Sequence, residues 1–105
     1  MSSDQPNVPR VGTLLSGAYD SIADVPGVRV GHCTLNAGAL QTGVTVVYPH
    51  QQSLFFNKVP AAATVLNGFG KSVGLLQVEE LGVLETPIAL TNTFSVSAVA
   101  QAQIQ

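Results

Sequence analysis

Residues 58–96, KVPAAATVLNGFGKSVGLLQVEELGVLETPIALTNTFSV, decide the fold of this chain. They combine an apolar run, a glycine-rich turn, a short amphipathic segment and a Thr-Asn-Thr corner in fewer than forty residues. Turns at this density, with so few charges, are typical of the interior of a layered enzyme and not of a free-standing binding module. We therefore expect strands and helices in layers, in the α/β or α+β class.

The first half of this stretch predicts a strand, a turn and a helix. The small apolar run at 61–66 is followed by Asn-Gly, which favours a buried strand with close neighbours. A tight turn is expected at 67–70. Apolar residues at helical spacing over 73–81 then predict a short amphipathic helix, with Gly82 well placed to end it.

Strands are also expected on both sides of this region. Alternating or β-branched residues at 28–35 and 43–48 predict two strands, and the short loop at 36–41 suggests that they form a hairpin. A further strand is expected at 87–90. A helix is expected from Ser95 onward, and its pattern is unfinished where the sequence stops.

The remaining segments have a polar or turn-forming character. Residues 1–10 predict a flexible leader, and 11–105 predict the N-terminal part of one domain that is incomplete at its C-terminus. Pro26-Gly27 predicts a turn. The polar segment 50–57 contains Leu-Phe-Phe, so we expect a loop that fixes itself to the core.

The composition predicts that other protein covers much of this chain. Charged residues make up 10% of the sequence and apolar residues 46%, against roughly 25% charged residues in typical globular chains. A small domain has much surface for its volume and needs polar residues to cover it. We therefore expect contacts with a further part of the protein or with sister subunits.

Charge and hydropathy argue against several classes of partner. The net charge is −2 and the four basic residues do not cluster, so no nucleic-acid surface is expected. No apolar run approaches the ~20 residues of a membrane span, and the first residues lack a secretory signal pattern. Cys33 is the single cysteine, so no internal disulfide is possible, and the cytoplasm is the default location.

Gly70-Lys71-Ser72 invites comparison with a phosphate-binding loop. That loop requires another glycine five residues before Gly70, and Val65 occupies that position. The alternative is a turn that needs its glycines for positive φ or for close backbone approach. The second interpretation is favoured.

The histidines and the cysteine form no recognisable catalytic or metal site. His32 and Cys33 are neighbours in a predicted strand, so their side chains point to opposite faces and do not share a metal or form a nucleophile–base pair. His50 adds no ligand spacing. Structural roles are favoured for both histidines, and a place in the core is favoured for Cys33.

Three glutamates and the Thr-Asn-Thr corner remain as candidates. Glu79 and Glu80 are expected on a solvated helix face, whereas Glu85 either caps the turn before a strand or supplies a carboxylate. Residues 91–93 lie between a predicted strand and a predicted helix, where layered folds present polar groups to ligands. Thr93 is an N-cap candidate, and Asn92 has donors and acceptors to spare, so capping and site lining both stay open.

A family resemblance is carried by segments spread along most of the chain. They are IADVPGVRVGH at 22–32, TGVT at 42–45, NGFG at 67–70 with Gly74, ELG at 80–82, ETPI at 85–88 and LTNT at 90–93. Together they resemble the P1-family peptidases (peptidase family S58), which are self-processing aminopeptidases related to DmpA and to the β-peptidyl aminopeptidases. Two departures concern the substrate: many members have an acid at Lys71 and a glycine at Ser97.

The resemblance implies a partial αββα sandwich, like that of the N-terminal nucleophile hydrolases. It implies that the precursor cuts itself before a serine, which then acts on short peptides, amides or esters without a metal or other cofactor. It also implies a homo-oligomer of processed units. That serine is expected downstream of this sequence, since none of Ser53, Ser72, Ser95 and Ser97 follows the family's cleavage context.

No catalytic residue is therefore assigned here, and the chain alone is expected to be inactive. Asn92, Gly68 and Gly70 are candidates for the surroundings of the substrate site. Three rivals stay open: a small enzyme with His32 or His50 as base, an inactive paralogue that docks on a larger partner, and a subunit that binds a small molecule through the turn at 68–72.

Overall fold

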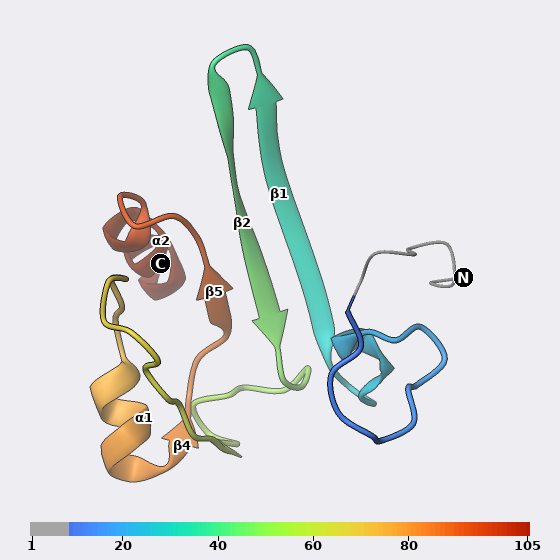
Figure 1. The fold of residues 1–105 in the computed structure, drawn as a ribbon. Coiled ribbons are helices and arrows are strands. Elements are labelled where there is room, and N and C mark those ends of the chain that lie inside the picture. Colours follow the sequence, from blue (N-terminus) through green and yellow to red (C-terminus); the bar gives the residue numbers. More distant parts are fainter. Residues whose placement is uncertain (1–8) are drawn as a thin grey trace.

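The computed structural model describes residues 9–105 and has the expected mixed α/β character (Figure 1). In chain order, its elements are η2 (Ile22–Asp24), β1 (Arg29–Ala37), β2 (Leu40–Tyr48), β3 (Val59–Pro60), α1 (Leu75–Leu81), β4 (Val83–Leu84), β5 (Ile88–Leu90) and α2 (Val96–Ile104). Most of the predicted leader, residues 1–8, lies outside the described residues.

The expected hairpin forms from β1 and β2, and it is longer than predicted. The antiparallel register runs from Arg29↔Tyr48 to Ala37↔Leu40, so most of the residues expected to form a loop are paired. Gly38 adopts a φ of 58°, which gives a two-residue turn the twist that matches antiparallel strands. The predicted loop at 36–41 is therefore wrong, because one glycine closes the turn in two residues.

Strand β2 is the centre of a three-stranded sheet with the order β1-β2-β5. Strand β5 pairs with β2 only over Thr45–Val47, so the distal half of the hairpin projects beyond β5 (Figure 1). Helix α2 lies against one face of this sheet. Its Val99 and Ala102 share a depression with Val44 and Val46 of β2.

A second, smaller unit surrounds helix α1, which is confirmed as predicted. Gly82 ends the helix in the left-handed conformation, with φ 68° and ψ 18°, and its N–H donates to the Val78 carbonyl. The chain then enters β4, which pairs with β3 to form a two-stranded sheet. The Ala61 N–H donates to the Gly82 carbonyl at 2.9 Å, next to the last pair of this ladder.

The buried strand predicted at 61–66 is wrong. Residues 62–66 have no regular structure, and Leu66 is 94% exposed. Strand β4 offers only two residues for pairing, and the chain turns into α1 at Gly82. The pairing with β4 therefore ends at Ala61, and residues 62–66 pair with no strand in the part of the chain that the structure describes.

The buried core is small. Val47 and Leu54 are the buried hydrophobic residues among the described ones. Leu54 confirms that the loop at 50–57 fixes itself to the sheet, whereas Phe56 beside it is 83% exposed. Cys33 is also exposed, so its predicted place in a core is wrong for this chain: its strand edge and face have no covering layer.

No helix of the described residues is long and apolar enough to cross a membrane. The longest helix, α2, has nine residues.

Gly43 lies where the backbone of β1 leaves no room for a side chain on β2. A Cβ atom at Gly43 would lie 2.8 Å from the Cys33 carbonyl oxygen, whereas a Cβ at Gly31 would meet nothing within 4 Å. We expect Gly43→Ala to lower the free energy of opening the hairpin by about 1–3 kcal/mol, because the clash is with backbone. Gly31→Ala is the matched control. Amide hydrogen exchange of the hairpin measures both, and equal protection in the two variants would contradict this account.

Candidate functional site

The corner between β5 and α2 is organised by Asn92. Its Oδ1 accepts hydrogen bonds from the backbone N–H groups of Phe94 and Ser95, both at 3.0 Å. Its Nδ2 donates to Thr42 Oγ1 at 2.8 Å. Asn92 therefore forms a side-chain turn before α2. The N-cap residue of α2 is Ser95, which makes no side-chain cap hydrogen bond, so the N-cap role expected of Thr93 is wrong. One Nδ2 hydrogen remains for another partner.

The neighbouring Thr91 fastens the same corner to the hairpin. Its Oγ1 lies 3.5 Å from the Gly43 carbonyl oxygen, two residues before the end of the β2–β5 pairing at Thr45. Thr91 and Asn92 thus continue the contact between the strands through their side chains. This places the corner beside the middle of the hairpin.

The glycine-rich turn differs from its predicted role. Neither Gly68 nor Gly70 has a positive φ, and a Cβ at either position would meet nothing within 4 Å. The expectation that this turn needs its glycines for positive φ or close approach is therefore wrong. The residue that does need glycine is Gly74, with φ 92°.

The structure brings this turn to the Asn92 corner. The Lys71 Nζ lies 5.3 Å from the centre of the Phe94 ring, a cation–π distance. Asn92 accepts the N–H of that same Phe94. Two of the predicted parts of the site, the turn at 67–72 and the corner at 91–93, therefore lie side by side.

A groove of about 590 Å³ extends from this corner between α1 and α2. Its walls come from both helices, from β4 and β5, and from residues 61–63 and 71–74. Most of the lining is aliphatic, and a few polar side chains stand at its ends. Its volume is in the range of ligand pockets, roughly 300–1,000 Å³.

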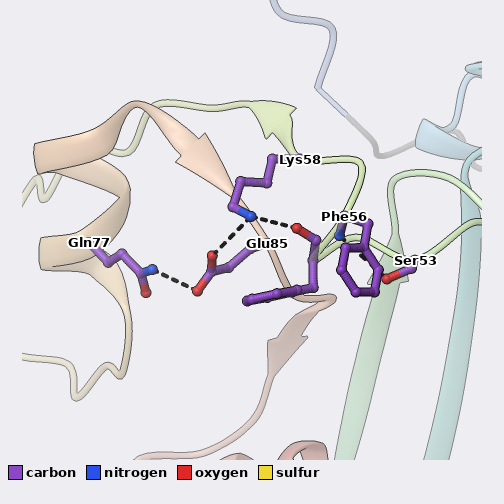
Figure 2. Close-up of polar contacts among 6 residues, drawn as sticks. Ser53, Phe56, Lys58, Gln77 and Glu85 are labelled. Carbon is purple, nitrogen blue, oxygen red and sulfur yellow. Dashed lines mark hydrogen bonds and ion pairs between the residues drawn. The ribbon is translucent and has the colours of Figure 1, made fainter.

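Glu85 is one of the groove's lining residues and belongs to a chain of polar contacts (Figure 2). Gln77 Nε2 of α1 donates to Glu85 Oε1 at 2.7 Å, and Lys58 Nζ lies 3.7 Å from Oε2. Lys58 also donates to the Phe55 carbonyl and lies 4.4 Å from the Phe55 ring centre. The Glu85 carboxylate thus joins α1 to the loop before β3, a structural role different from the predicted turn cap.

Both histidines make structural hydrogen bonds, as expected. The His50 Nδ1 accepts the Gln52 N–H at 3.1 Å, so Nε2 carries the hydrogen that is donated to the Asn57 carbonyl at 2.7 Å. The His32 Nδ1 lies 2.8 Å from the Oγ1 of Thr45, its partner across the strands. His32 and Cys33 lie on opposite faces of β1, as expected from the alternation of a strand.

Two other site hypotheses find no support in residues 9–105. Helix α1 begins at Leu75, not directly after Gly70-Lys71-Ser72, and has seven residues, so the phosphate-loop geometry is absent there. The described residues hold no group of three or more potential metal ligands. Glu79 and Glu80 are exposed on α1, as predicted.

Lys58, Gln77 and Thr42 were not predicted from the sequence. Lys58 and Gln77 reach Glu85 from separate elements, and Thr42 reaches Asn92 across 50 positions. A local motif does not reveal contacts of this kind. In the structure, Lys58 directly precedes β3 and Glu85 directly follows β4, so the pairing of these two short strands brings the two charges together.

Comparison with known proteins identifies relatives over most of the chain. The sequence model of Peptidase family S58 matches residues 20–105. A beta-peptidyl aminopeptidase BapA from Sphingosinicella xenopeptidilytica is 38% identical over 92% of this chain. Its namesake from Sphingosinicella microcystinivorans is 33% identical over 84%. The chain spans 26% and 24% of these two relatives, about a quarter of their length.

Solved structures agree with the fold. The PH0078 protein from Pyrococcus horikoshii OT3 superposes with a TM-score of 0.85 and 41% identity, over 90% of this chain and 30% of its own. A Burkholderia sp. beta-aminopeptidase superposes with a TM-score of 0.80 and 47% identity, over 90% of this chain and 28% of its own. These matches confirm the mixed α/β class and the family resemblance.

The turn that Asn92 forms before α2 is testable by two substitutions. Asn92→Ala removes both acceptor contacts and should destabilise this turn by about 0.5–1.5 kcal/mol, the usual range for a lost hydrogen bond. Asn92→Asp keeps an acceptor for both N–H groups and should stay close to the original chain. Amide exchange at Phe94 and Ser95 measures the effect. Equal exchange in the two variants would mean that the Asn92 side chain does not stabilise this turn.

Proposed function

Because the chain belongs to peptidase family S58, we propose that it forms the N-terminal part of a serine aminopeptidase. The whole enzyme releases N-terminal residues from short peptides, amides or esters. The nucleophile is a serine freed as a new N-terminus by self-processing, in a segment outside these 105 residues. The family match over residues 20–105 is the observation that carries this proposal.

The chemistry follows from the position of such a serine. Its hydroxyl attacks the scissile carbonyl to form an acyl-enzyme and releases the amine product, and water then hydrolyses the ester. The free α-amine of the same residue acts as the base. No metal or other cofactor takes part in this scheme.

The described residues support a scaffolding role for this chain. In residues 9–105, Ser53 Oγ accepts a backbone N–H from Phe56, Ser21 Oγ accepts one from Ala23, and Ser16 contacts an arginine. No serine hydroxyl there hydrogen-bonds to a histidine, a lysine or a carboxylate. A serine within a continuous chain needs such a base to become a good nucleophile, whereas the proposed serine uses its own free α-amine. The contacts of the described serines therefore fit a supporting role and not the reacting one.

Within the proposed enzyme, the Asn92 corner and the glycine turn lie at the edge of the substrate site. Asn92 keeps one N–H available beyond its three structural contacts. Gly68 and Gly70 leave open space where other residues would carry a side chain. Backbone and amide groups of this kind suit the recognition of a peptide.

The partners in this proposal are the remaining part of the S58 polypeptide and sister subunits in a homo-oligomer. Support comes from the low charge content and from large apolar side chains that are almost fully exposed, such as Leu15, Phe69 and Phe94. The proposal places the enzyme in the cytoplasm.

The same exposed surface favours a second candidate, an inactive docking chain that binds a larger partner. The two candidates differ in what association achieves. In the aminopeptidase proposal, association with the remaining S58 segments completes an active site. In the docking proposal, association produces no hydrolysis.

A turnover assay separates the two candidates. The purified chain should show no turnover on a panel of L-, D- and β-aminoacyl p-nitroanilides, because it lacks the nucleophile. Co-expression with the part of the Burkholderia beta-aminopeptidase that it does not span should give a complex that hydrolyses at least one member. That Burkholderia part expressed alone is the control.

Two results would contradict the aminopeptidase proposal. Turnover by the chain alone that survives further purification would show that the reacting group lies within these residues. A stable complex that hydrolyses no member of the panel would favour the docking candidate.

A further inference from the structure

Strand β5 presents a free edge. In the sheet order β1-β2-β5, one side of β5 pairs with β2, and no strand of residues 9–105 pairs with the other. A free edge carries unpaired N–H and C=O groups and acts as a template for another strand. Strand β5 ends at Leu90, directly before the corner that contains Asn92.

The groove of about 590 Å³ lies along this edge. Its lining includes Ile88 and Leu90 of β5 together with Val78, Val96, Val99 and Ala100 of the two helices. A space of this size would otherwise hold on the order of twenty water molecules against aliphatic walls. Apolar side chains are the better filling for such a space.

Most polar side chains in the lining already have partners. Both oxygens of Glu85 have partners in Gln77 and Lys58. Gln103 donates to the Pro87 carbonyl at 3.3 Å. A small-molecule site needs polar groups that converge on the ligand. Here these side chains are engaged within the chain, and the outer edge of β5 offers unpaired backbone groups.

We propose that the free edge of β5 and the groove beside it bind an extended apolar strand from the part of an S58 polypeptide that this chain does not span. The strand would continue the sheet beyond β5 and place alternate side chains between α1 and α2, as in β-strand addition. This inference names the contact surface for the partner in the proposed function and rests on that proposal.

The length of the relatives favours this occupant over a second copy of the chain. About three quarters of each matched relative lies outside the aligned region, which is long enough to supply a further strand. A second copy has β1 and β5 as the free edges of its three-stranded sheet. Pairing β5 with its own copy would join only three residues on each side, and β1 carries Arg29, His32 and Asn36.

The test uses two neighbouring residues of α2. Ala100 lines the groove, whereas Gln101 is exposed and lies outside its lining. The 105-residue chain is co-expressed with a tagged form of the part of the Burkholderia beta-aminopeptidase that it does not span. Ala100→Lys should reduce the amount of chain recovered on the tag at least tenfold, because it places a charge among aliphatic walls. Gln101→Lys should be recovered like the original chain.

A second variant separates loss of binding from loss of folding. Val78→Lys alters the opposite wall, on α1, and should also reduce the amount of chain recovered on the tag at least tenfold. The amount of each variant in the soluble extract is measured in parallel, so that degradation is not counted as lost binding.

The outcomes distinguish this inference from the proposed function. If Ala100→Lys and Val78→Lys are recovered like Gln101→Lys, the groove is not the contact surface, even where the complex hydrolyses peptides. If both variants lose binding but the original complex hydrolyses no substrate, the groove is the contact surface and the aminopeptidase proposal is wrong. If the chain instead forms a dimer that Ala100→Lys disrupts, and is not retained by the tagged partner, the occupant is a second copy and the inference is overturned.

Discussion

The pairing of β2 with strands on both sides is the interaction on which the rest of this structure depends. β2 pairs with β1 along its whole length and with β5 over Thr45–Val47. Its Thr42 and Gly43 also receive the side-chain contacts of Asn92 and Thr91. The position of the β5–α2 corner, and with it one end of the groove, therefore follows from the position of one strand.

Weaker contacts hold the second unit together. Lys58 and Glu85 form an ion pair whose side chains are 37% and 24% exposed. Ion pairs with this much access to water contribute roughly 0–1 kcal/mol. The Gln77 hydrogen bond and the left-handed Gly82 add definition to α1 and β4. Such contacts fix orientation, but they bury little apolar surface. The shape of the groove is thus defined by backbone pairing and caps, and its aliphatic lining remains available for binding.

The sequence predicted the elements whose signals are local. The hairpin, the helix that ends at Gly82, the strand at 88–90 and the helix after Ser95 each follow from spacing, propensity or a glycine at a defined position. The predictions that failed depended on distant partners or on backbone conformation. Residues 61–66 have strand-like composition, but among the described residues no strand pairs with them beyond Ala61.

In the candidate site, too, local features were predictable from the sequence and contacts between distant elements were not. That residues 91–93 form a polar corner was predictable, because a strand precedes them and a helix follows. That Asn92 also contacts Thr42 was not predictable, because Thr42 comes from another strand. The Glu85 contacts depend on elements that the chain folding brings together, and Lys71 reaches Phe94 in the same way. The spacing of residues in the sequence does not predict contacts between elements that lie far apart in the chain.

Amide hydrogen exchange tests the central claim most directly: that the apolar surface around β5 is an interface with the rest of an S58 protein. The chain is compared alone and in complex with the part of the Burkholderia beta-aminopeptidase that it does not span. The account predicts that the isolated chain is protected mainly in β1 and β2, and that the complex gains protection at residues 88–90 and along α1 and α2. Unchanged exchange at β5 and both helices on complex formation would contradict it.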